Sequence, residues 1–459
     1  MWLDSAIVVG YLGVLLFIGL RGGKQVKNAA DFTAAGGRYG VPVIFATLAA
    51  SYIGGGFSSG NASAAFSRGI GSTVALMGFS LAMMAIGRFL VPGVTRFAGI
   101  ATVGGILEQD YGRGARVLTG LFSFLSCAGV VAAQMEAMGL TFRTLLGVSE
   151  TVGILIGCGI VLLYTTFGGM QSVIAADMVQ FLLLAVGMPL LLWGGLRQAG
   201  GLTATLSALP PEYFDPLNGT TLLGFCSLFL SLAVGEALAP PYTQRLLIGR
   251  TPQVTARATV LSGLFAAPFF AVTGLIGLVA FLLDPAADAA TAMPRMILTV
   301  LPIGLRGIVM AAMVSIILSA ADGFLNGASI GLVCDAVLPL QPATPPALQL
   351  KLLRYVNLLT GVAAVALAFL LPGIFDILLV AYSFWCPVLL VPLAAAFRGI
   401  RAPRRVFYAA LLAGFVTSLV WGLFLRNPLS LDGSVVGLFA NAAVFFGGRA
   451  ISKYKQNRL

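Results

Sequence analysis

Residues 50–57 read ASYIGGGF and lie within an apolar segment that extends from about residue 41 to residue 66. The three consecutive glycines, Gly54–Gly56, strongly lower the helix propensity there. Another apolar segment, 220–239, runs into the stretch GEALAPP at residues 235–241. Its two prolines remove backbone donors and clash with the preceding helical turn. Both segments are therefore predicted to be broken helices.

The composition places these segments in a membrane. Hydrophobic residues make up 59% of the 459 residues and charged residues only 9%, whereas about a quarter of a soluble domain is charged. No soluble core could bury this much apolar surface, so we predict an all-α membrane protein with the lipid bilayer as its solvent. About thirteen segments approach the roughly 20 apolar residues of a spanning helix. They are 4–21, 41–66, 70–92, 116–146, 150–167, 172–196, 220–239, 257–283, 300–333, 352–371, 374–397, 406–425 and 434–451.

The distribution of basic residues predicts the orientation. Most of the 27 Lys and Arg fall in connections that share one side of the membrane if the N-terminus is outside. Positive charge accumulates in cytoplasmic loops, so the C-terminus is expected in the cytoplasm and the protein in the cell inner membrane. The same bias accounts for the net charge of +11, and no nucleic-acid partner is expected. The basic connections are 21–38, 96–116, 245–257, 351–354, 398–405 and 449–458.

The two broken helices occupy equivalent places in the chain. Each opens a group of five predicted spans, one at about 41–196 and one at about 220–397, within a single transmembrane domain that covers 1–459. The segments 4–21, 406–425 and 434–451 flank these groups. Matching breaks in two inverted repeats indicate a binding site near the membrane midplane, because unwound backbone is tolerated there only where it lines a cavity.

This organisation favours a secondary transporter that moves a small organic solute by alternating access. The chain contains no histidine and no visible nucleophile–base pair or metal cluster, so a membrane enzyme is not expected. A passive channel would lack the paired broken helices. A transporter-like sensor would need a long cytoplasmic extension, and only a short segment follows the last predicted span.

Four motifs resemble the sodium/solute symporter family, which has the LeuT-type fold. The resemblance covers essentially the whole chain and implies an inverted repeat of 5+5 helices with flanking helices. The stretches at 50–57 and 241–245 look closest to the choline-transporter-like branch. The motifs are GGMQSV at 168–173 with Asp177 and Gln180, ASYIGGGF at 50–57, PYTQR at 241–245, and LSAADG at 318–323 with Leu325 and Asn326.

The resemblance implies a sodium site where the first broken helix meets the span at 300–333. Its ligands would be the carbonyls of Ala50, Ile53 and Ile316 and the hydroxyl of Ser319. The family's second hydroxyl position falls on Ala320, which has no oxygen to offer. Asp177 corresponds to a residue near the family's ion-release route. The coupling ion is therefore open between weakly bound sodium and a proton, and no other cofactor is expected.

The resemblance to the choline branch also implies an aromatic cage for an organic cation. Tyr52 and Phe79 stand at two cage positions and Ala239 at a third, so the cage is incomplete, and ordinary packing is the alternative interpretation of both rings. Gly55 in the first break and Tyr382 are further candidates for the substrate site.

Two carboxylates, Glu136 and Glu236, are predicted at membrane depth, where ionised groups are rare and usually functional. Glu236 lies beside the second break and is expected to bind a cation or a proton, while Glu136 stays open between a structural and a functional role. A sodium-independent or proton-coupled transporter of an organic cation or amine is thus the alternative function. The sequence predicts neither the substrate's identity nor the oligomeric state.

Overall fold

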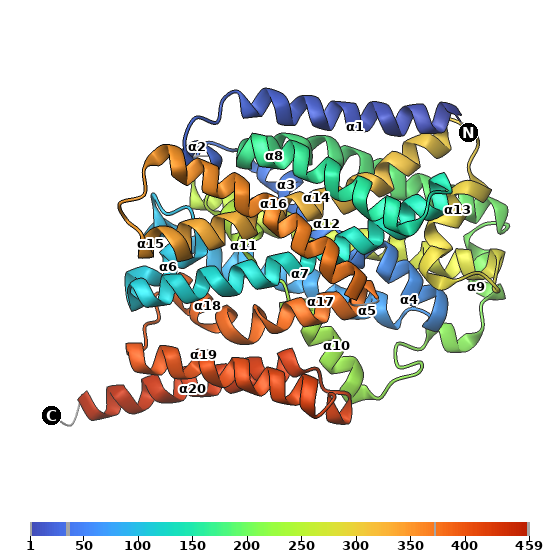
Figure 1. The fold of residues 1–459 in the computed structure, drawn as a ribbon. Coiled ribbons are helices and arrows are strands. Elements are labelled where there is room, and N and C mark those ends of the chain that lie inside the picture. The colour runs from blue at the N-terminus through green and yellow to red at the C-terminus, as the bar shows by residue number, and fades with distance from the viewer. Residues whose placement is uncertain (1, 34–36, 371–372, 457–459) are drawn as a thin grey trace.

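The computed structural model describes residues 2–33, 37–370 and 373–456. Within these ranges the regular structure is helical, apart from one isolated bridge between Tyr39 and Gly249. Most of the long helices lie side by side in one bundle, and the beginning of α1 and the end of α20 lie at opposite ends of it (Figure 1). The predicted all-α membrane architecture is therefore confirmed.

The helices begin and end as follows. The first part of the chain forms α1 (Trp2–Gly23), α2 (Ala29–Thr33), α3 (Val41–Tyr52), η1 (Gly56–Gly60), α4 (Asn61–Arg68), α5 (Gly71–Ala85), η2 (Ile86–Leu90), η3 (Val91–Phe97), α6 (Val103–Tyr111), α7 (Arg113–Leu146), α8 (Glu150–Gln198), α9 (Leu202–Ala208) and η4 (Pro211–Phe214). The second part forms α10 (Leu222–Val234), α11 (Pro240–Leu246), α12 (Pro252–Leu283), η5 (Ala289–Thr291), α13 (Ala292–Val300), α14 (Leu305–Ile330), η6 (Gly331–Val337), α15 (Leu338–Leu340), α16 (Pro346–Leu370), α17 (Ile374–Ser383), η7 (Cys386–Leu390), α18 (Val391–Phe397), α19 (Arg404–Leu419), η8 (Val420–Phe424), η9 (Pro428–Ser430) and α20 (Gly433–Gln456).

The number of spans depends on how interrupted helices are counted. Ten helices of the described part are long and apolar enough to cross a membrane, or eleven if the bent pair Val41–Tyr52 and Gly56–Arg68 is one span. The 49-residue α8 would be about 74 Å long at 1.5 Å per residue, more than twice the hydrocarbon thickness. It is interrupted at Gly169, where φ is 59°. The sequence-based count of thirteen is higher than eleven because it treats α8 as two spans, divided at this interruption, and counts the short α10 as a further span.

Gly169 also allows a close approach between elements. A side chain at this position would place its Cβ 3.0 Å from the Cα of Phe32, which belongs to α2. The positive φ and the lack of space both favour glycine. This position is the turn in the predicted family motif at residues 168–173.

The centre of the bundle is α14. In its most apolar window 94% of the residues are buried, compared with 28% for α1, α19 and α20. The pair α19 and α20 lies along one side of the bundle (Figure 1). These helices are therefore peripheral, as expected for flanking elements, while the division of the inner helices into two repeats stays a prediction.

Candidate functional site

The first break falls where the glycine run predicted it. The helix α3 ends at Tyr52, and the chain bends by 65° before it continues as η1 and α4. The N–H of Gly54 donates to the carbonyl of Tyr52 at 3.0 Å instead of to that of Ala50, its partner in a regular helix. The N–H of Gly55 donates to Oε1 of Gln134 at 2.8 Å. The break thus frees the Ala50 carbonyl and is fixed to α7.

The second break spans the residues between Val234, where α10 ends, and Pro240, where α11 begins. Leu238 has a φ of 54°, a backbone conformation that is uncommon for a residue other than glycine. Two side chains hold the unwound carbonyls: Trp385 Nε1 donates to Ala237 O at 2.9 Å, and the Thr243 hydroxyl donates to Leu238 O at 2.6 Å. The prolines predicted a break near residues 237–241, and the observed break at residues 235–239 overlaps that stretch.

Glu236 lies in this unwound segment and is buried, with 6% of its surface exposed. Its Oε1 accepts a hydrogen bond from the Tyr382 hydroxyl at 3.0 Å, and its Oε2 accepts one from the Tyr242 hydroxyl. Tyr382 comes from α17 and Tyr242 from α11, so the carboxylate joins both elements to the break. In the sequence, Tyr242 was noted only as part of the motif at residues 241–245. Its place beside the Pro-Pro pair was the signal that could have identified it as a site residue.

Both breaks face a small cavity of about 10 Å³, which is room for about one water molecule. Of the substrate-site residues that the sequence predicted, Tyr52 and Glu236 line it, and Gly54 and Gly56 line it in place of Gly55. Phe79, Ala239 and Tyr382 are buried nearby but do not form its wall. The lining residues are Ser51, Tyr52, Gly54, Gly56, Phe57, Val130, Gln134, Glu236, Tyr242, Ala320, Phe324 and Leu378.

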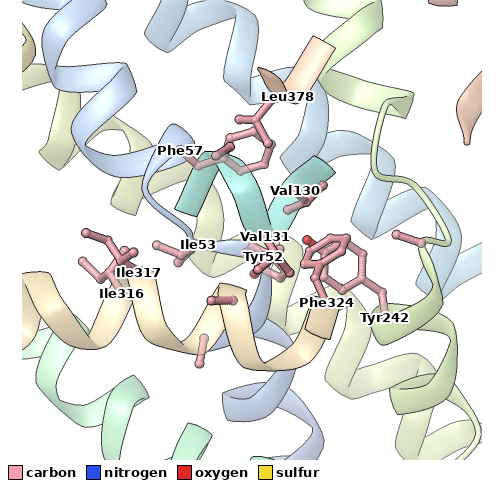
Figure 2. Packing of buried hydrophobic residues seen from close by; sticks show 14 of the residues in the cluster. Tyr52, Ile53, Phe57, Val130, Val131, Tyr242, Ile316, Ile317, Phe324 and Leu378 are labelled. Atoms are coloured by element: carbon pink, nitrogen blue, oxygen red, sulfur yellow. The ribbon is translucent and has the colours of Figure 1, made fainter. Parts of the chain in front are cut away.

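Aromatic rings pack against one another around this cavity. The ring centroids of Tyr52 and Phe79 are 5.0 Å apart, those of Tyr52 and Tyr242 are 6.2 Å apart, and those of Tyr242 and Phe324 are 5.6 Å apart. Figure 2 shows Tyr52 at the break with Tyr242 and Phe324 close by. The two predicted cage rings are thus brought together, but their direct contact leaves no room for a solute between them.

A second cavity, of about 610 Å³, lies between the end of α4, the start of α5 and the segment around residues 216–232. Glu136 of α7 contributes to its wall, and its Oε1 accepts a hydrogen bond from the N–H of Gly373 at 2.8 Å. Gln134, two residues earlier on α7, lines the central cavity. The two cavities therefore both adjoin this turn of α7, from different faces of the helix.

The predicted ion-site residues gather between the first break and α14. Ala50 and Ile53 lie at the break, and Ile316 and Ser319 lie on α14, all buried. A Cβ on Gly54 would be 2.8 Å from the Cβ of Ala320. Ala320, which has no side-chain oxygen, therefore directly faces the break. The carbonyls and one hydroxyl are suitable for a hard cation, which binds oxygen ligands, but Ala320 leaves a gap among them.

Asp177 accepts hydrogen bonds from three neighbouring side chains. Its Oδ1 accepts a hydrogen bond from the Ser319 hydroxyl at 2.7 Å, and its Oδ2 accepts one from the Thr47 hydroxyl and forms an ion pair with Arg245 Nη2 at 2.8 Å. Sequence reasoning assigned Arg245 to a basic cytoplasmic connection, which is wrong: its side chain is completely buried. Because the Pro-Pro pair starts α11 only five residues before it, Arg245 stays inside the bundle.

Comparison with known proteins places this geometry in context. The model of the "Sodium:solute symporter family" matches residues 32–392. The high-affinity proline transporter PutP of Bacillus subtilis is 27% identical over 47% of this chain and 48% of its own length. The human high affinity choline transporter 1 is 28% identical over 53% of this chain and 44% of its own. The chain thus matches about half the length of these two relatives.

A longer match is found with the sodium/sialic acid symporter SiaT of Proteus mirabilis, which is 24% identical over 79% of this chain and 76% of its own length. Among solved structures, a Na⁺-coupled sialic acid symporter in a substrate-bound outward-open state superposes with a TM-score of 0.84 at 20% identity, over 98% of this chain and 97% of that one. A nucleobase-cation-symport-1 family transporter in a closed conformation gives a TM-score of 0.62 at 16% identity, over 92% and 96%. These likenesses show a shared fold.

Proposed function

Because this chain belongs to the sodium:solute symporter family, we propose that it is a secondary active transporter that imports a small organic solute by alternating access. The observation that carries the proposal is the meeting of two broken helices around one small cavity at the centre of the bundle. Unwound backbone and a buried carboxylate are costly in a membrane, and they are expected there when they bind a transported solute or ion.

The two cavities support a transport cycle. The large one adjoins the end of α4 that the proposed orientation places outside, whereas the central one has room for only about one water molecule. A solute would enter through the large cavity and reach the centre after the side chains that separate the two cavities move apart. Closure of that route and opening at the opposite end of the bundle would complete the import.

Sodium coupling is proposed to be weak. The proposed ligands are the carbonyls of Ala50, Ile53 and Ile316 and the hydroxyl of Ser319, and Ala320 provides none. Asp177 could contribute through Oδ1, which accepts one hydrogen bond, whereas its Oδ2 already accepts two. The alternative is that a carboxylate such as Glu236 carries a proton in place of sodium.

The protein is a multi-pass membrane protein, and we place its N-terminus outside and its C-terminus in the cytoplasm of an inner-membrane protein. The basic connections support this orientation. The start of α1 and the end of α20 lie at opposite ends of the bundle, which agrees with an odd number of crossings (Figure 1).

The test is uptake by the purified protein in proteoliposomes, with sodium and proton gradients imposed separately. The panel contains amines, amino acids, sugars and carboxylates. Accumulation of one solute class that depends on an imposed gradient is the expected result. Failure of every class to accumulate under either gradient would contradict the transporter function.

A further inference from the structure

We propose that a cluster of basic side chains, at the ends of α19 and α20 that the proposed orientation places in the cytoplasm, binds the phosphate groups of anionic phospholipids. This lipid site is separate from the cavities and from the transport function proposed above. Residues 398–405 contain four arginines, residues 449–456 contain one arginine and two lysines, and neither stretch has an acidic residue. The basic cluster consists of Arg398, Arg401, Arg404, Arg405, Arg449, Lys453 and Lys455.

The packing of α19 against α20 brings the two stretches together. The start of α19 and the end of α20 lie at the same end of the bundle (Figure 1). Arg449 Nε donates a hydrogen bond to the carbonyl of Arg401 at 3.0 Å. Lys453 follows Arg449 by one turn on the same face of α20. Basic residues of both stretches are therefore neighbours in space.

The positive charge of the basic cluster is mostly uncompensated. Arg401 forms an ion pair with Asp110. Arg398 donates to the carbonyl of Phe89 at 3.1 Å, which satisfies a donor without cancelling its charge. Like charges held together repel one another, so an anion between them is favoured. The members with no hydrogen bond or ion pair in the described structure are Arg404, Arg405, Lys453 and Lys455.

Exposed apolar side chains continue the basic residues along both helices. Leu412 and Val416 follow Arg405 at the spacing of one helix face on α19, and Phe446 precedes Lys453 at the same spacing on α20. All three apolar side chains are exposed. A phospholipid has the same order of groups, with a phosphate at the surface and acyl chains below it. A soluble anion would use the charges and leave the apolar side chains without a partner.

The depth of the basic cluster also fits a lipid headgroup. Tyr454 lies between Lys453 and Lys455 and is 56% exposed, and tyrosines are typical of the membrane–water interface. Basic residues that immediately follow a spanning helix on the cytoplasmic side attract anionic lipids. Because this attraction falls off within about 8 Å at physiological salt, a cluster at the interface benefits from it most.

Lipid titrations of the purified protein test the proposal. Thermal unfolding in a neutral detergent is measured while cardiolipin, phosphatidylglycerol, phosphatidylcholine or inorganic phosphate is added. We expect both anionic lipids to raise the unfolding temperature, because a ligand of the folded state stabilises that state. Phosphatidylcholine and phosphate should leave it unchanged at the same concentrations. Added salt should weaken the effect of the anionic lipids.

Two matched double variants locate the site. Arg405→Gln with Lys453→Gln removes two exposed charges of the basic cluster. A basic residue near an anionic surface contributes roughly fivefold in affinity, so the lipid concentration that gives half of the shift should rise at least about tenfold. Arg197→Gln with Arg426→Gln removes the same charge from exposed positions near the ends of α8 and η8, and it should leave this concentration unchanged.

Equal shifts by phosphatidylcholine and by the anionic lipids would overturn the proposal. A variant of the basic cluster that responds to lipid like its control would overturn it as well. A shift produced by phosphate alone would assign the cluster to soluble anions and exclude the lipid as its occupant. If the double variant does not fold, Arg405→Gln and Lys453→Gln are measured separately. The transport function is judged independently, by solute accumulation under the imposed gradients.

Discussion

Arg245 Nη2 lies 2.8 Å from Asp177 Oδ2 in the interior of the bundle, and neither side chain is exposed. The same guanidinium donates through Nε to the Thr47 hydroxyl at 2.8 Å and through Nη1 to the Pro241 carbonyl at 3.0 Å. The pair therefore links α11 to α8 and, through Thr47, to α3. Removing one partner would leave an uncompensated charge in a water-poor environment.

Arg245→Met is expected to lower the free energy of unfolding by about 3–5 kcal/mol, the range for breaking a buried ion pair from one side. The double variant Arg245→Met with Asp177→Asn should recover part of this loss, because it leaves no unpaired charge. Thermal unfolding in detergent measures both. Arg257→Met, at an exposed position on α12, is the control. An unfolding temperature for Arg245→Met equal to that of the control would show that the pair does not stabilise the bundle.

The fold was largely predictable from the sequence because its causes are local. The glycines of residues 54–56 and the prolines at 240 and 241 break helices through backbone chemistry, and both breaks lie close to where they were expected. The lengths of the apolar segments predicted the membrane-spanning helices in the same way. The count differed only at α8 and α10, where an interrupted helix and a short one are grouped differently.

The site was predictable only in part because side-chain partners depend on three-dimensional packing. Glu236 could be selected from its position beside a break, but the tyrosines that bind it come from α11 and α17. No spacing in the sequence connects Tyr382 with Glu236. Arg245 was misplaced because positive-inside counting treats every arginine near a span end as a loop residue. The two prolines shortly before Arg245 were the one signal in the sequence that this residue belongs to the interior of the bundle.

Ala320→Ser is expected to raise the apparent affinity for sodium. The substitution would supply the missing oxygen beside the first break, and an added ligand worth about 1.4 kcal/mol raises the affinity about tenfold. Sodium-dependent uptake in proteoliposomes measures the change, and Ala321→Ser, one residue further along α14, is the control. Ser319→Ala should abolish any sodium dependence. Tight sodium dependence in the unmodified protein that survives Ser319→Ala would place the ion elsewhere.

Gly55→Ala is expected to destabilise the protein by about 1–3 kcal/mol through overpacking. Its Cβ would lie 2.6 Å from the Cβ of Ala137, so α7 or the break would have to move. Gly159→Ala is the matched control, because that Cβ would have nothing within 4 Å, and it should be neutral or stabilising by up to about 1 kcal/mol. Thermal unfolding and solute affinity are measured together. Equal stability of the two variants would mean that the contact between the break and α7 is looser than described.

Tyr382→Phe is expected to weaken solute affinity without unfolding the protein. It removes the hydrogen bond to Glu236 Oε1, which is 3.0 Å long, and keeps the ring that packs in the core. A hydrogen bond to a charged group contributes about 1.5–3 kcal/mol, or roughly ten- to a hundredfold in affinity. Tyr382 acts here as a positioning residue, so the loss should appear in the concentration for half-maximal uptake more than in the maximal rate. Tyr355→Phe, at a position where 74% of the residue is exposed, is the control. If Tyr382→Phe keeps the affinity of the unmodified protein at the same unfolding temperature, this tyrosine does not orient Glu236 toward the solute.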